Sequence, residues 1–217
     1  MWPSSRLDGP GRILNLSRIA LLLCVGVGPF LGVSPACAQS SALTLPRNLL
    51  QLVDESELVL QGQVRNVTLE PHQQLNHLLM VVVTLQVEEN LKGRTPATFT
   101  FRQAVIDQRD QQQKLGYRVG QHLLLTLIRP SVYGLSSPAG MQQGRFSIVS
   151  GPDGKLQVSN GFGNAGLFRG LDSQLPAAGA RVSPEIRSML AQTEPGPVPL
   201  TELKSLIRTI ATRNSPQ

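Results

Sequence analysis

Apolar and polar residues alternate in several short segments of this chain, and a period of two is typical of half-buried β-strands. The clearest segment runs from Leu79 to Glu88, where every second residue is Leu or Val and the opposite face changes from apolar to charged. The turn residues 89–93 (ENLKG) follow, and residues 97–102 then alternate again. The two segments predict an antiparallel hairpin.

The segment His122–Ile128 is more apolar and predicts a central strand. Leucine stands at every second position from Leu123 to Leu127, and Leu124 and Ile128 make the other face apolar as well. Because a strand with two apolar faces must be covered on both sides, we expect it in the interior of the sheet.

Residues 58–64 predict a further strand, in which two glutamines alternate with apolar residues or glycine. Beyond Arg65 the apolar phase moves by one residue, to Val67 and Leu69. A one-residue slip turns every side chain to the other face of a sheet, so the sequence predicts a β-bulge near Arg65 and Asn66.

A second hairpin is predicted later in the chain. Phe146 and Ile148 continue the alternation, the turn tetrapeptide 151–154 (GPDG) follows, and Leu156 and Val158 form the returning segment. Glycine and proline at these positions are typical of a tight turn between two strands.

Helices are predicted only near the ends. Apolar residues at helical spacing predict a short helix that ends near Glu55. Ser183 and Pro184 are typical of the cap and first turn of a second helix. After the proline-rich hinge 195–199, an amphipathic pattern predicts a last helix from Leu200.

Two segments have no usable period. Residues 103–116 are polar and rich in glutamine, which indicates a flexible loop. Residues 161–182 are rich in Gly, Ala and Leu, and we expect an irregular connection there.

Six predicted strands, joined mostly by short turns, indicate a mainly β protein built as a small antiparallel barrel of five or six strands. A short N-terminal helix and C-terminal helices accompany it. We expect a barrel domain at 39–160, the irregular connection at 161–182 and a C-terminal helical extension at 183–212.

Residues 1–38 have the three regions of a secretory signal peptide. Arg6, Arg12 and Arg18 make the leader basic, an apolar run follows, and small residues up to Ala38 predict cleavage after it. The apolar run of about 15 residues is shorter than the roughly 20 that a spanning helix needs. We therefore expect an exported protein, periplasmic or extracellular, with no membrane span in the mature chain.

Both cysteines of the chain, Cys24 and Cys37, lie in this leader, so no disulfide or thiolate chemistry is expected in the mature protein. Lipid attachment at Cys37 is the minor alternative to simple cleavage. Ala36 suits that processing, but Ser34 stands where a leucine would be wanted.

The chain has a net charge of +6, and its basic residues are scattered. Nucleic-acid binding would want a clustered basic stripe and exposed aromatic residues, so we expect no nucleic-acid partner. An unidentified protein or an anionic envelope polymer remains the expected partner class.

Candidate chemistry is sparse. His72 and His77 have an offset that occurs in one half of a zinc site, but a zinc site needs three or four ligands, and we interpret the pair as solvated loop residues. Ser136 and Ser137 lie between glycines but lack the Gly-x-Ser-x-Gly frame of an exposed nucleophile. We expect no catalytic residue, metal or cofactor, and hence no enzyme.

The order of the motifs SELVLQGQV, VTLQVEENLKG, GYRVGQHLLLTL and SPAGMQQGRFSIV resembles a family of uncharacterised bacterial secreted proteins. That family is in turn similar to the netrin-module and metalloproteinase-inhibitor group of OB-fold barrels. The resemblance covers roughly 49–160 and the last helix, and it implies an OB-like barrel. The inhibitors use an N-terminal cysteine at the protease zinc, whereas this mature chain would begin with Gln39 and Ser40.

We therefore predict a non-catalytic exported binding or envelope-associated module. A loop on a rigid frame is a common place for a binding residue, so the partner-contact residues are expected in and after the loop that holds Tyr133. They are Tyr133, Ser136, Ser137, Gln142 and Gln143. The alternatives are an inhibitor or accessory protein of a secreted protease, and a hydrolase with a dispersed site.

Overall fold

The computed structural model describes residues 45–75, 77–177, 183–191 and 194–213. These residues belong to one compact unit, Ser41–Gln217. The predicted signal peptide lies outside the described residues. Within the described part of the chain, none of the helices combines the length and the apolar character needed to cross a membrane.

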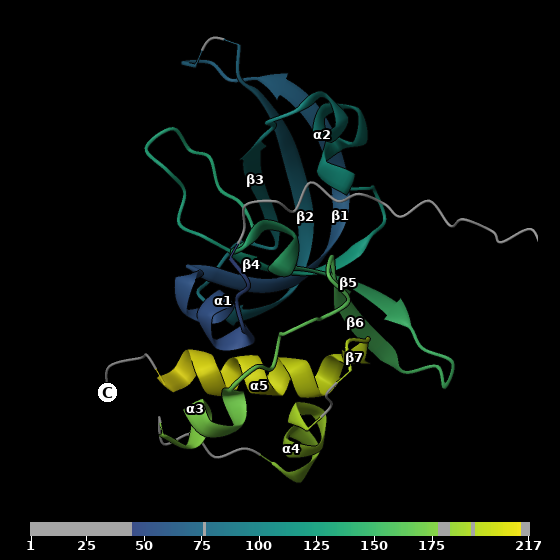
Figure 1. Cartoon of the computed structure of the whole chain (residues 1–217). Helices are drawn as coiled ribbons and strands as arrows, with labels where there is room; N and C mark the ends of the chain where they lie inside the picture. Colours follow the sequence, from purple (N-terminus) through teal and green to yellow (C-terminus); the bar gives the residue numbers. More distant parts are fainter. Residues whose placement is uncertain (1–44, 76, 178–182, 192–193, 214–217) are drawn as a thin grey trace, which may run out of the picture. The chain divides into compact units, whose positions relative to one another are not determined.

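The protein is mainly β and contains one antiparallel sheet of seven strands in the order β3-β2-β1-β4-β5-β6-β7 (Figure 1). The strands are β1 (Leu58–Pro71), β2 (Leu79–Lys92), β3 (Thr98–Ala104), β4 (His122–Leu127), β5 (Arg145–Ser150), β6 (Leu156–Asn160) and β7 (Val198–Pro199).

The prediction of a barrel with five or six strands is wrong, because the sheet is open and has seven strands. A barrel closes only when its two edge strands pair with each other. Here β5 pairs with β6, and β6 pairs with β7, a two-residue strand inside the predicted proline hinge. The far edge of the sheet is therefore occupied by β7, and β3 remains an edge strand.

Strand β4 is central, as predicted. It lies between β1 and β5, and it is the fourth of the seven strands. Leu123, Leu125 and Leu127 point into one apolar cluster and Leu124 into another, so both faces of the strand are covered.

The predicted bulge is confirmed by a register shift between Val64 and Asn66 in the pairing of β1 with β2. Two further shifts, at Val59/Leu60 and Gln61/Gly62, were not expected. Gly62 fits this crowded pairing because a Cβ there would lie 2.6 Å from the Gln86 carbonyl oxygen.

The described part of the chain also contains five α-helices and two 3-10 turns. The helices are α1 (Leu49–Glu55), α2 (Gln108–Gln113), α3 (Leu171–Ala177), α4 (Pro184–Leu190) and α5 (Leu200–Arg213), and the turns are η1 (Lys114–Gly116) and η2 (Met141–Gln143). Three of these helices, α1, α4 and α5, were predicted. Helix α4 has the expected Ser183 cap, whose side chain accepts from the Ile186 backbone N–H at 3.3 Å.

Helix α2 corrects the prediction of a flexible loop between β3 and β4. The Asp107 side chain caps it by accepting from the Asp110 backbone N–H at 2.7 Å, and Lys114 ends it in the left-handed conformation. The segment 161–182, expected to be irregular, contains helix α3 after a series of turns.

Two apolar clusters form the interior. The helix-side core lies between the helices and one face of the sheet, and it includes Leu49, Leu52, Leu124, Phe146, Leu203 and Leu206. The strand-side core lies on the opposite face, and it includes Val64, Val81, Val83, Phe101, Tyr117, Leu123 and Leu125. Figure 1 shows α5 with α1 on one side and α3 and α4 on the other.

A polar cluster fastens α5 to β2. Lys204 and Arg208 both pair with the carboxylate of Glu89, and Lys204 also donates to Gln61 Oε1 at 2.9 Å. Burial alone would raise the pKa of Glu89, but the hydrogen bonds and charges of the two cations outweigh it. They hold the pKa of this carboxyl below its usual value.

Tyr117 is the polar anchor of the strand-side core. Its hydroxyl donates to Gln103 Oε1 at 3.0 Å, and Arg145 lies over its ring, with the guanidinium carbon 4.7 Å from the ring centroid. Burial raises the pKa of Tyr117 to about 12, although the nearby Arg145 charge opposes that rise.

Candidate functional site

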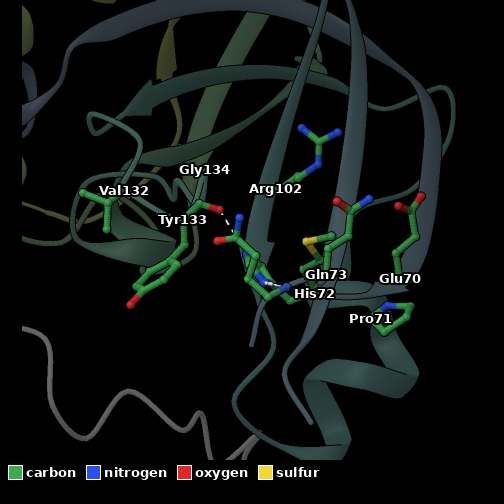
Figure 2. A pocket seen from close by; sticks show the side chains of 10 residues that line it. Glu70, Pro71, His72, Gln73, Arg102, Val132, Tyr133 and Gly134 are labelled. Atoms are coloured by element: carbon green, nitrogen blue, oxygen red, sulfur yellow. Dashed lines mark hydrogen bonds between the residues drawn. The ribbon is translucent and has the colours of Figure 1, made fainter. Parts of the chain in front are cut away.

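A crevice of about 270 Å³ lies beside the edge strand β3. Its walls come from the end of β1 and the connection that leads into the start of β2, from strand β3, and from the loop between β4 and η2 (Figure 2). The side chains that matter most for its chemistry are Glu70, His72, Met80, Arg102 and Tyr133.

The loop that carries Tyr133 forms a turn that is held by several hydrogen bonds. The Ser131 backbone N–H donates to the Leu135 carbonyl at 2.8 Å, and the Gly134 N–H donates to the Ser131 carbonyl at 2.9 Å. The Ser131 hydroxyl oxygen accepts from the N–H groups of Tyr133 and Leu135, both at 3.3 Å. Gly134 has a φ of +72°, a conformation that glycine adopts without strain. The turn therefore holds Tyr133 at the rim of the crevice.

His72 links the connection between β1 and β2 to the loop that carries Tyr133. Its Nε2 lies 3.0 Å from the Tyr133 carbonyl oxygen, and the two rings meet edge to face with their centroids 6.1 Å apart. Its Nδ1 accepts from the backbone N–H groups of Gln74 and Leu75, at 3.1 and 3.0 Å. Because Nδ1 is an acceptor, Nε2 carries the proton and donates to Tyr133. Both ring nitrogens of His72 are therefore engaged by the backbone.

Arg102 supplies an unpaired positive charge. Its side chain is exposed on β3, and its guanidinium has no hydrogen bond or ion pair to any residue that the structure describes. Met80 beside it is only 5% exposed and gives the crevice an apolar lining. Glu70 supplies a carboxylate, which accepts from the Thr68 hydroxyl at 2.7 Å. The crevice thus offers a cation, a carboxylate and an aromatic rim to a ligand.

Of the predicted contact residues, Tyr133 lines the crevice and the other four serve the frame of the protein. The Ser136 hydroxyl donates to the Ile128 carbonyl at 2.7 Å, and the Ser137 carbonyl accepts from the Ile128 N–H at 3.0 Å. The Gln142 carbonyl accepts from the Gly161 N–H at 3.0 Å.

Gln143 fastens the segment before α1. Its side-chain oxygen accepts from the Arg47 backbone N–H at 2.7 Å, and its side-chain nitrogen donates to the Leu45 carbonyl at 3.1 Å. Gln143 is 7% exposed, so its amide is a structural group of the interior and not part of the crevice.

The structure does not bring the candidate metal and nucleophile residues together into one site. His77 does not line the crevice, and no group of three or more His, Cys, Asp or Glu able to hold a metal ion occurs among the described residues. The Ser136 hydroxyl donates to the Ile128 carbonyl, so it forms no serine–histidine pair within the part of the chain that the structure describes.

Sequence reasoning missed Arg102 and treated His72 only as a candidate metal ligand. Arg102 sits in an alternating strand, where an exposed arginine is ordinary, and no motif distinguishes it. His72 and Tyr133 are separated by 61 residues in the chain, so only the fold shows that they meet.

No family model, no curated protein and no solved structure matches this chain.

Proposed function

We propose that this protein is a non-catalytic exported binding module and that its ligand occupies the crevice beside β3. The observation that carries this proposal is the unpaired Arg102 guanidinium in one crevice with the half-exposed Tyr133 ring. Aromatic and arginine side chains dominate binding energy at protein interfaces. The rigid turn around Tyr133 also reduces the ordering cost of binding.

The contacts of the crevice favour binding over hydrolysis. A general base needs a nitrogen free to take a proton, but both nitrogens of His72 are hydrogen-bonded to the backbone. A serine nucleophile needs that base as its neighbour, but the Ser136 hydroxyl is directed to Ile128.

Export is the second part of the proposal, and the pattern of residues 1–38 supports it. The resemblance to netrin-module proteins stays a proposal at the level of sequence motifs. N-terminal sequencing of the protein recovered from the envelope or medium tests export directly. We expect the sequence to begin at Gln39, whereas a chain that keeps Arg6 and Arg12 would contradict it. A blocked N-terminus at Cys37 would identify the lipoprotein instead.

Photo-crosslinking tests the crevice. Val132, which is 95% exposed at the rim, is replaced by benzoylphenylalanine, and the protein is irradiated in its native host. The matched control carries the same replacement at Lys155, an exposed residue in the turn between β5 and β6.

We expect an adduct from position 132 that is absent from position 155 and that disappears when Arg102→Glu is added. Adducts of equal strength from both positions, or none from position 132, would contradict a crevice that binds a ligand.

A further inference from the structure

Strand β3 has one side paired and one side open. It is the terminal strand of the sheet and pairs with β2 alone. At its two ends, the Ala97 carbonyl accepts from the Val87 N–H at 2.7 Å, and the Val105 N–H donates to the Leu79 carbonyl at 2.9 Å. Successive residues of an antiparallel strand direct their backbone groups to opposite sides. The backbone groups of Thr98, Thr100 and Arg102 therefore point away from β2.

One hydrogen bond within the protein already occupies part of this open side. The Ser136 N–H donates to the outward Arg102 carbonyl at 2.7 Å. No backbone or side-chain group elsewhere in the described residues is bonded to the outward N–H or C=O of Thr98 or Thr100. The loop therefore covers the Arg102 end of the edge, whereas the outward groups of Thr98 and Thr100 stay open among the described residues.

The crevice adjoins the same edge. Arg102 belongs to both, because its backbone faces outward from β3 and its side chain lines the crevice. Thr98, Thr100 and Arg102 are all exposed and share one face of the strand, and the Thr100 hydroxyl lies 3.0 Å from that of Thr84. A strand added along β3 would thus pair with the free backbone groups of Thr98 and Thr100 and run toward the guanidinium of Arg102.

We propose that the ligand is an extended peptide segment of another protein, which adds to β3 as a further strand and places an acidic side chain on Arg102. This inference rests on the proposed binding function and names its partner class. Free N–H and C=O groups on an edge strand recognise a peptide backbone, and the alternating side chains supply specificity. Arg102 selects the acidic residue because its guanidinium can hold a carboxylate with two hydrogen bonds.

A displayed library of random 12-residue peptides, selected on the protein purified after expression of the full chain, supplies the probe. The strongest selected peptide is synthesised, and its Kd is measured for the native protein and for Thr100→Pro, Thr100→Ala and Arg102→Ala. Proline removes the Thr100 hydroxyl and the outward N–H of residue 100, an N–H that makes no bond within the sheet, and proline is tolerated in such edge positions. The alanine variant loses the same hydroxyl and keeps the N–H.

We expect Thr100→Pro to weaken binding by about tenfold or more, and Thr100→Ala to weaken it much less. The selected peptides should carry Asp or Glu, and Arg102→Ala should weaken them by about tenfold. If Arg102→Ala weakens binding but Thr100→Pro does not, the crevice binds a ligand and strand addition is overturned. If neither variant weakens binding, or if the library gives no binder, the inference also fails.

Amide exchange provides a second measurement that does not depend on a proline variant folding. In the native protein, the amides of Thr98 and Thr100 should exchange rapidly, and the selected peptide should protect them. An amide of Thr100 that stays unprotected in the complex would overturn strand addition. A native protein that is a dimer, and that Thr100→Pro converts to a monomer, would show a second copy of this chain on the edge and would also overturn a peptide partner.

Discussion

The sheet has two edges, and the chain treats them differently. At one end β7 is two residues long, ends at Pro199 and continues directly into α5. Pro197 and Pro199 have no N–H to offer, and the Asn164 side chain donates to the Gly196 carbonyl at 2.8 Å. Short strands and prolines are common ways to block an edge. At the other end β3 has seven residues and no proline, and its outward groups at Thr98 and Thr100 are open in the described structure.

We therefore expect the residues that stabilise the protein to be different from the residues that bind a ligand. The helix-side core lies between the helices and one face of the sheet, and it includes Val198 of β7 as well as Val59 of β1 and Leu91 of β2. The β3 end carries the crevice, whose Arg102 and Tyr133 contribute no buried core contact. A ligand can therefore bind at β3 without repacking the interior. Substitutions of buried core residues should therefore have large stability effects, whereas substitutions of the exposed crevice residues should affect binding.

The largest effect is expected from Leu203→Ala. Leu203 is fully buried between α5 and the sheet, so the variant leaves a cavity in the helix-side core. We expect the free energy of unfolding in urea to fall by about 2–5 kcal/mol. Thr212→Ala on the exposed face of α5 is the control and should change stability by less than about 0.5 kcal/mol. Equal losses in the two variants would mean that α5 does not carry the core.

The next largest effect on stability is expected from Tyr117, because its ionisation makes the free energy of unfolding depend on pH. Its folded pKa of about 12 lies above its ordinary value of 10.0, so burial favours the protonated hydroxyl. That contribution is fully present below pH 10 and is lost as the pH rises through about 12. We expect a loss of roughly 2–3 kcal/mol across this window. Ultraviolet titration of Tyr133→Phe, in which Tyr117 is the remaining tyrosine, measures the pKa of Tyr117 directly. Ionisation near pH 10 in the folded protein would contradict the buried hydroxyl.

The local parts of the fold could be predicted from the sequence, because each depends on near neighbours. Alternation from Leu79 to Glu88 and leucines on both faces of 122–128 are sufficient for β2 and the central β4. Ser183 before Pro184 is sufficient for the start of α4. The bulge near Asn66 follows from a change of phase within one strand.

The non-local parts could not be predicted. The glutamine-rich segment after β3 has no apolar period, and only the Asp107 cap indicates α2. The sheet would close into a barrel only if another strand paired with the outer side of β3. The opposite edge is formed by Val198 and Pro199, which pair with β6 and not with β3, so the sheet stays open. The crevice needs His72, Arg102 and Tyr133 from three distant segments, of which the sequence pointed only to Tyr133 as a contact residue.

Glu89 tests the link between α5 and β2 at a smaller scale. Its folded pKa is lowered, so its ionised form stabilises the protein above the ordinary pKa of 4.5, and this contribution is lost as the pH falls through the folded pKa. We expect Glu89→Gln to reduce stability by about 1 kcal/mol at pH 7, since Lys204 and Arg208 are partly exposed. The difference from the native protein should shrink in acid, as measured by urea unfolding at several pH values. A deficit that stays constant down to the acid limit would assign the effect to packing instead of charge.

Arg102→Ala should have the smallest effect on stability and therefore distinguishes the two ends most clearly. Arg102 is exposed and has no side-chain partner among the described residues, so its removal should change the free energy of unfolding by less than about 0.5 kcal/mol. Arg145→Ala is the matched control, because that guanidinium lies over Tyr117 and donates to the Leu115 carbonyl. It should cost about 1–2 kcal/mol in urea unfolding. If Arg102→Ala destabilises the protein as much as Arg145→Ala, then Arg102 is a structural residue and the charge in the crevice is not reserved for a ligand.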